Sequence, residues 1–229
     1  MTEAPDATPD WADQAEQRLL DAALPRVREF GWTSRLLAAA AKAAGLSLGE
    51  AELVCPGGAR DLAALLSRRH DQAALKALAA VDPATLKVRE RIRRGAVERV
   101  EAAMADEAAT RRLMGYFALP QNLALGGRLL WESADRLWRW AGDTSTDENH
   151  YSKRAILAGL LASTLAVRLS SSPAEAERHL DRGIEAVMAY EKAKARCAPS
   201  DLSEKIAAAL GKLRHGRATP AETEVEAAG

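Results

Sequence analysis

The chain has 229 residues, 48% of them hydrophobic, and is therefore long enough to bury a substantial core as one domain. Its 32 basic and 32 acidic residues balance, which argues against a global attraction to nucleic acid or to anionic lipid. The two cysteines, Cys55 and Cys197, lack the spacing of a zinc site or of a disulfide framework.

The composition is typical of an all-α protein. It is rich in Ala, Leu, Arg and Glu, and no run alternates in hydrophobicity as a strand would. Glycines and prolines lie between the periodic segments and mark the helix ends. We predict helices over residues 11–30, 33–44, 47–54, 59–79, 84–104, 107–118, 121–141, 147–169, 173–196 and 200–214.

The N-terminus and the apolar runs bear on membrane targeting. Residues 1–10 have neither the basic and apolar regions of a secretory signal nor the Arg-rich amphipathic character of a mitochondrial presequence. The longest nearly continuous apolar run, residues 155–167, is too short and too interrupted to span a bilayer. We therefore expect a soluble or peripheral protein, with residues 1–10 and 216–229 disordered.

Residues 33–44 and 47–54 have the dimensions of a helix-turn-helix, with Gly45 in the turn. The second of these helices carries Glu50 and Glu52 and no Lys or Arg. A helix that enters a groove lined by phosphates needs the opposite charge. The pattern predicts a helix-turn-helix shape that does not bind DNA.

No catalytic or metal-binding motif is present in the sequence. The four histidines are scattered, and a surface or core position is expected for each: His70, His150, His179 and His215. The protein is therefore expected not to be an enzyme and to need no cofactor.

Three apolar segments, residues 113–119, 121–141 and 155–169, could enclose either a dry core or a ligand cavity. The glycines 126, 127 and 159 leave room beside the long side chains. A pocket for an apolar ligand is mostly hydrophobic with few polar groups, and so is a core. The residues alone leave both alternatives open.

Residues 131–157 contain the end of one helix, a turn and the start of the next. Gly142 suits the left-handed conformation just past a helix end, and residues 143–147 offer side-chain oxygens that cap the following helix. The two helices are expected to form an antiparallel hairpin. The residue chemistry of their polar connection favours a capped, solvated turn, and the alternative is a functional surface loop.

Residues 199–215 are expected to form a separate, basic amphipathic helix. Its membrane-facing candidates are Leu202, Ile206, Leu210 and Leu213 with Lys205 and Lys212. Such a helix can pack on its own domain, on a dimer mate or on a membrane surface.

Residues Gly142–Leu157, preceded by Ala134–Trp138, closely resemble the signature of the ubiquinone-biosynthesis accessory family called coenzyme Q protein nine. A looser match covers about residues 15–195 and includes Leu20–Pro25, Gly31–Trp32 and Pro56–Gly58. The resemblance implies a TetR-like fold, a homodimer, isoprenoid lipid binding and assistance to the di-iron hydroxylase that acts on demethoxyubiquinone. The chain departs from the family pattern at Glu148 and His150, where the family usually carries aromatic residues.

The resemblance also implies the site residues. Residues 11–196 would form the TetR-like lipid-binding domain, with an isoprenoid lipid or ubiquinone precursor against Tyr116, Leu123, Leu130, Trp138, Leu157, Leu160, Leu161 and Thr164. The hydroxylase would dock around the turn on Asp135, Leu137, Asp147, His150, Tyr151 and Arg154. Asp135 and Leu137 are expected to face outward if Ala134 and Trp138 face inward, because successive helix positions point in different directions.

The sequence thus favours a non-catalytic protein of ubiquinone biosynthesis that presents a quinone precursor to the hydroxylase. The expected location is cytoplasmic, peripheral at the inner face of a bacterial membrane, or the matrix side of the mitochondrial membrane if the chain is a processed eukaryotic protein. The alternative is a TetR-type transcription regulator with a small-molecule pocket, for which a basic recognition helix would be expected.

Overall fold

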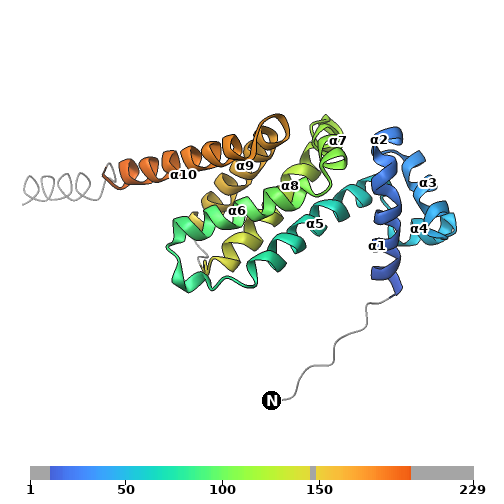
Figure 1. Cartoon of the computed structure of the whole chain (residues 1–229), viewed down its shortest axis with the longest axis horizontal. Helices are drawn as coiled ribbons and strands as arrows, with labels where there is room; N and C mark the ends of the chain where they lie inside the picture. The colour runs from blue at the N-terminus through green and yellow to red at the C-terminus, as the bar shows by residue number, and fades with distance from the viewer. Residues whose placement is uncertain (1–10, 145–147, 197–229) are drawn as a thin grey trace, which may run out of the picture. The chain divides into compact units, whose positions relative to one another are not determined.

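The computed structural model describes residues 11–144 and 148–196, and all regular structure within them is helical (Figure 1). The predicted all-α class is confirmed, and the order of helices is consistent with a TetR-like bundle. The predicted terminal tails and the amphipathic helix over 199–215 lie outside the described residues. So do its membrane candidates Leu202, Lys205, Ile206, Leu210, Lys212 and Leu213.

The N-terminal helices are short and pack around one hydrophobic cluster. They are α1 (Trp11–Ala23), the 3-10 turn η1 (Leu24–Arg26), α2 (Val27–Phe30), α3 (Ser34–Ala44) and α4 (Leu48–Val54). The single helix predicted over residues 11–30 is interrupted at Pro25, because proline lacks the N–H that a helix interior needs and clashes with the preceding turn. Leu19, Leu20 and Leu36 are fully buried in this cluster.

The segment from α3 to α4 has the predicted helix-turn-helix arrangement. Gly45 follows α3 with a φ of 69°, in the left-handed region that favours glycine. Ser47 caps α4: its Oγ accepts from the Glu50 N–H at 3.2 Å, and its own N–H donates to Glu50 Oε2 at 2.8 Å. The Glu50 carboxylate is therefore occupied in holding the start of the helix.

The longer helices follow after Gly58, with a second 3-10 turn, η2 (Pro83–Thr85). They are α5 (Ala59–Leu78), α6 (Val88–Met104), α7 (Glu107–Phe117), α8 (Pro120–Trp140), α9 (Glu148–Ser170) and α10 (Pro173–Arg196). α5 packs on α6 and α8, and α9 packs on α8 and α6 (Figure 1). A second hydrophobic cluster fills the space between them and includes Leu78, Ile92, Leu137, Leu157 and Leu161.

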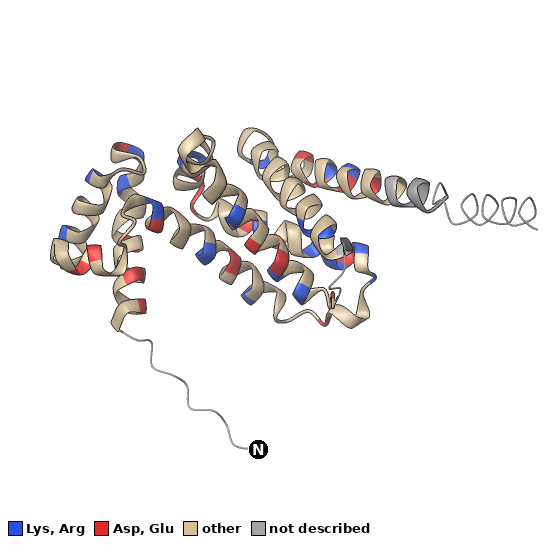
Figure 2. Ribbon diagram, turned by 180° about the vertical axis from the view of Figure 1, so that it is seen from behind, with Lys and Arg blue, Asp and Glu red and all other residues tan. Residues whose placement is uncertain are grey.

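Three further features of these helices describe the surroundings of the site. The chain divides into two compact units after Ile184, within α10, and the residues of the site all precede that point. Basic and acidic residues are interspersed along α5, α8 and α10 (Figure 2). None of the helices that the structure describes is both long enough and apolar enough to cross a bilayer.

The predicted helix end at Gly142 is confirmed. Gly142 has a φ of 84° and donates its N–H to the Arg139 carbonyl at 3.0 Å, while the Asp143 N–H reaches the Trp138 carbonyl at 3.0 Å. Residues 145–147, including the predicted partner residue Asp147, lie outside the described residues.

Candidate functional site

A cavity of about 360 Å³ lies among α5, α6, α7, α8 and α9. Its volume falls within the range of about 300 to 1,000 Å³ that is usual for small-molecule sites. Apolar side chains of α7, α8 and α9 form most of its wall: Leu113, Met114, Phe117, Leu123, Leu129, Leu130, Ala162 and Leu165. The three apolar segments therefore enclose both a dry core and a cavity.

The polar lining comes from α5 and α6, which are not among the three apolar segments, and from Thr110 of α7. Ser67 and His70 of α5 and Arg99 of α6 line the cavity, and they are 6%, 2% and 8% exposed. The cavity thus has an apolar wall and a deeply buried polar end.

Among the predicted lipid-binding residues, Leu123 and Leu130 line this cavity and the other six lie elsewhere. Leu157 and Leu161 belong to the second hydrophobic cluster, and Leu160 and Trp138 pack against it. Tyr116 lines a separate hollow beside Cys55, and the buried Thr164 faces α6 and α10 near Val100 and Leu180. The lipid-binding role of these six residues stays a prediction, because helical spacing identifies a buried face but not which neighbour or ligand covers each part of it.

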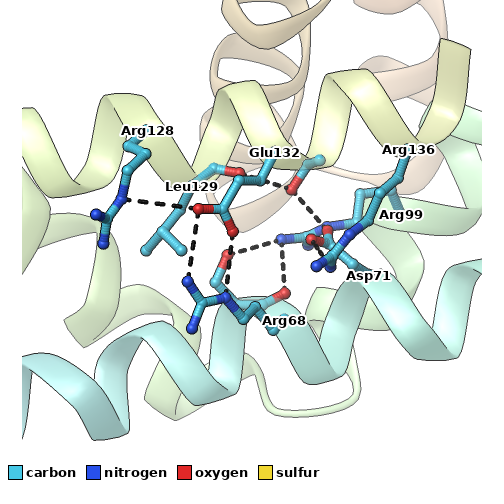
Figure 3. Close-up of polar contacts among 9 residues, drawn as sticks. Arg68, Asp71, Arg99, Arg128, Leu129, Glu132 and Arg136 are labelled. Atoms are coloured by element: carbon cyan, nitrogen blue, oxygen red, sulfur yellow. Dashed lines mark hydrogen bonds and ion pairs between the residues drawn. The ribbon is translucent and has the colours of Figure 1, made fainter.

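The buried end of the cavity is held by a network around Asp71 (Figure 3). Asp71 Oδ1 accepts from Arg99 Nε at 2.5 Å and from Ser133 Oγ at 2.6 Å, and Asp71 Oδ2 accepts from Arg136 Nη1 at 2.8 Å. Arg99 Nη2 also donates to the carbonyl and the hydroxyl oxygen of Ser67, at 3.3 and 3.2 Å. The network joins α5, α6 and α8, so it fixes the position of the Arg99 guanidinium at the cavity.

His70 is a buried core histidine, one of the two positions expected from the sequence. Its Nε2 lies 3.1 Å from Asp106 Oδ2. Burial lowers the pKa of His70, and the hydrogen bond from His70 lowers the pKa of the Asp106 carboxyl. His70 is therefore neutral at pH 7, with the Nε2–H donating to an ionised Asp106.

Stability should fall as the pH drops below about 6.5, the pKa of an unperturbed histidine. In that window the unfolded chain takes up a proton at position 70 that the folded chain, with its lowered pKa, does not. The stabilisation linked to His70 is complete when the pH lies above the pKa of this histidine in the unfolded chain. It is lost as the pH falls through the lower pKa that His70 has in the folded chain. Urea unfolding of the wild type and of His70→Asn at pH 7.5 and 5.5 should show a smaller pH effect in the variant. An equal pH effect in both proteins would assign the slope to other groups.

The turn between α8 and α9 differs from the predicted docking surface at two residues. Arg154 is 2% exposed and donates from Nε to Asp135 Oδ1 at 2.6 Å and from Nη1 to Asp143 Oδ2 at 3.1 Å. Leu137 is also 2% exposed, because Gly95 of α6 has no side chain and leaves room for it. The predicted outward positions of Arg154 and Leu137 are therefore wrong.

An aromatic cluster remains on the surface of this turn. Tyr151 is 64% exposed, and its ring lies 6.1 Å from the ring of Trp131 and 5.1 Å from that of His150. Asp135 is partly exposed beside Arg139, with which it forms an ion pair at 2.8 Å. Trp131 was not among the predicted partner residues, although its position three residues before Ala134 in an aromatic-rich helix end could have indicated it.

The fold and the cavity define an all-α, TetR-like protein with an internal apolar pocket. Residues 123–191, which cover most of α8, the turn, α9 and most of α10, match the family model described as COQ9. The chain is 30% identical over 185 residues to the Ubiquinone biosynthesis protein COQ9, mitochondrial, of Rattus norvegicus, covering 77% of this chain and 59% of the relative. The corresponding proteins of Xenopus tropicalis and Homo sapiens are 29% and 28% identical, each over 72% of this chain and 54% of the relative.

The resemblance of residues 142–157 to this family is confirmed by the match of the family model and by relatives about 30% identical over most of the chain. The chain spans between half and three fifths of the length of the curated relatives that it matches.

Proposed function

We propose that the protein is a non-catalytic, isoprenoid-lipid-binding accessory protein of ubiquinone biosynthesis that presents a quinone precursor to the demethoxyubiquinone hydroxylase. The observation that carries the proposal is the apolar cavity of about 360 Å³ in a chain that matches the COQ9 family model. Burial of apolar surface gives such a ligand most of its binding free energy, at roughly 25 cal/mol per Å².

The proposal includes a homodimer that acts peripherally at a membrane, on the cytoplasmic side in a bacterium or on the matrix side in a mitochondrion. The alternative of a TetR-type regulator is less well supported. Glu50 and Glu52 are exposed on α4, where a recognition helix would present basic or amide side chains to DNA. The Glu50 carboxylate is moreover bonded to Ser47 and cannot be turned to a base without uncapping the helix.

Filling the cavity from Gly127 tests lipid binding. Gly127 lines the cavity, and a Cβ at this position meets no atom within 4 Å, so Gly127→Trp should place an indole in the ligand space without disturbing α8. Native mass spectrometry of gently purified protein, with lipid identification, should find isoprenoid lipid in the wild type and less than about a tenth of it in the variant, since a loss of 1.4 kcal/mol already weakens binding tenfold.

Gly159→Trp is the matched control. Gly159 is, like Gly127, an exposed helical glycine with open space at its Cβ, but it lies on α9 and does not line the cavity, contrary to the sequence-based expectation. The control should keep its lipid. Equal lipid content in wild type and both variants would reject the cavity as the lipid site.

The hydroxylase is proposed to dock on the aromatic cluster of Trp131, His150 and Tyr151. Exposed tyrosines are often hot spots of interfaces, where truncation costs about 2 kcal/mol or more, equivalent to roughly a thirtyfold loss of affinity. Tyr151→Lys should therefore weaken hydroxylase binding by about that factor and leave the circular dichroism and the bound lipid unchanged. Leu53→Lys, on the 72% exposed Leu53 of α4, is the control and should bind normally. Wild-type affinity of Tyr151→Lys would move the docking surface elsewhere.

A further inference from the structure

We propose that the cavity binds its ligand with the polar end inward, so that a neutral ring oxygen, such as a quinone carbonyl, accepts hydrogen bonds from Arg99 and the alkyl tail leaves past Leu123. This inference rests on the proposed function, because it names the part of the ligand that the cavity recognises.

The Arg99 guanidinium has hydrogen-bonding capacity to spare. It carries five N–H donors. Nε donates to Asp71, and Nη2 donates to the two oxygens of Ser67, whereas Nη1 bonds to none of the residues that the structure describes. Arg99 lines the cavity and is 8% exposed. Nη1 is not among the buried side-chain atoms without a partner, so it is accessible to a small molecule, and a ligand oxygen there gains a charge-assisted hydrogen bond.

The exposure of the lining residues gives the direction of the ligand. The residues with polar side chains, Ser67, His70, Arg99 and Thr110, are all less than 9% exposed. Leu123, which lines the same cavity, is 62% exposed. No polar lining residue is therefore exposed, and the accessible lining is apolar, which matches a ligand whose ring enters first and whose tail remains near the surface.

The charges favour a neutral acceptor over a carboxylate or phosphate. Arg99 and Asp71 form a buried ion pair, with side chains 9% and 4% exposed, that has no net charge. Arg136, the second cation on Asp71, has a side chain that is 35% exposed, so water screens its charge. An anion in the apolar cavity would lose its hydration without an unpaired buried cation to compensate it. A carbonyl loses much less hydration and still accepts from Nη1.

The cavity volume limits how much of the ligand is enclosed. About 360 Å³ lies near the lower end of the range for small-molecule sites. A substituted ring and the first part of its tail fill such a space, and a long isoprenoid tail has to continue outside. An exit beside the exposed Leu123 meets this requirement.

Three probes with the same decyl chain test the recognition of the ring oxygen on the full, delipidated chain. They are a fully substituted 1,4-benzoquinone, a benzene with alkyl groups in place of the ring oxygens, and a decyl-chain carboxylate. Full substitution of the quinone prevents thiol addition. Isothermal titration should give the quinone at least tenfold tighter binding than the hydrocarbon, because a hydrogen bond to a charged donor contributes about 1.5 to 3 kcal/mol. The carboxylate should bind more weakly than the quinone.

Arg99→Met keeps the aliphatic volume and removes the donors. Asp71 retains its bonds from Arg136 and Ser133 in this variant. The preference for the quinone over the hydrocarbon should fall below about threefold, while the hydrocarbon binds as to the wild type. Equal binding of quinone and hydrocarbon to the wild type, or tighter binding of the carboxylate, would overturn the inference and leave lipid binding standing. Binding of none of the probes would also reject the proposed function.

A photo-crosslinking probe tests the orientation on the wild-type chain and so does not depend on a variant that folds. The probe is the same quinone with a diazirine at the end of its alkyl chain. After irradiation and digestion, the adducts should lie on residues 114–127, which include Met114 and Leu123 at the accessible wall. Adducts on residues 67–71 or beside Arg99 would show the tail at the closed end and would refute the inward position of the ring.

Discussion

Replacing Arg154 by Ala is expected to lower the free energy of unfolding by about 3 kcal/mol. The Arg154 guanidinium is 2% exposed and joins Asp135 of α8 to Asp143 of the turn. Without the Arg154 guanidinium, the largely buried carboxylates of Asp135 and Asp143 each lose one cationic partner. The expected effect lies at the lower end for broken buried pairs, because Asp135 keeps Arg139 and Asp143 keeps Lys153 at 2.8 Å.

Arg139→Ala is the matched control for this experiment. Arg139 pairs with the same Asp135, but its side chain is 73% exposed, so its removal should change the stability by at most about 0.5 kcal/mol. Urea unfolding followed by circular dichroism measures both variants. A similar small loss for Arg154→Ala and Arg139→Ala would show that burial does not strengthen the Arg154 pair.

Asp71→Ala is expected to destabilise the protein by about 4 kcal/mol, the largest effect among the predicted variants. Asp71 is 3% exposed and accepts hydrogen bonds from Arg99, Ser133 and Arg136. Without the carboxylate, Arg136 can turn to water, but the buried Arg99 retains only the two oxygens of Ser67. An uncompensated cation would then remain in the interior, between α5 and α6.

A double-mutant cycle distinguishes this electrostatic cause from simple loss of packing. Removing both charges in Asp71→Ala/Arg99→Met should recover at least about 1.5 kcal/mol relative to Asp71→Ala, because replacing a whole buried ion pair by apolar groups is often close to neutral. The surface pair gives the control: Glu132→Ala breaks its contacts with Arg68 and Arg128, whose side chains are 39% and 64% exposed, and should cost less than about 1 kcal/mol. A double variant no more stable than Asp71→Ala would contradict the electrostatic explanation.

The helix boundaries could be predicted because they depend on local chemistry. Gly45 and Gly142 adopt the left-handed conformation at the predicted helix ends, and Pro120 and Pro173 begin α8 and α10. The break at Pro25 was missed, since the apolar spacing of α1 continues across it. The similarity to the COQ9 family could be predicted from the long motif around the α8–α9 turn.

The site could be predicted only in part, because its chemistry depends on contacts between distant helices. Leu130 lines the cavity and Leu157 lies in the core, although both occupy inward faces of apolar helices. Spacing did not reveal that Arg154 pairs across the turn with Asp143. A usable signal for the polar end was present in α5, where Ser67, His70 and Asp71 interrupt an otherwise apolar face at three- and four-residue spacing. Polar residues in that pattern indicate a buried network when a partner such as Arg99 is available.

α5 is one continuous helix of 20 residues that takes part in both hydrophobic clusters. Leu62 and Leu66 near its start are buried with α1 and α3, Ser67 and His70 line the cavity, and Leu78 at its end is buried in the second cluster. Because a hydrogen-bonded helix moves largely as a rigid rod, a ligand that displaces the middle of α5 necessarily displaces what is packed on its first turns. The cavity and the helix-turn-helix therefore share one helix, and the N-terminal helices are the part of the surface that would move with it.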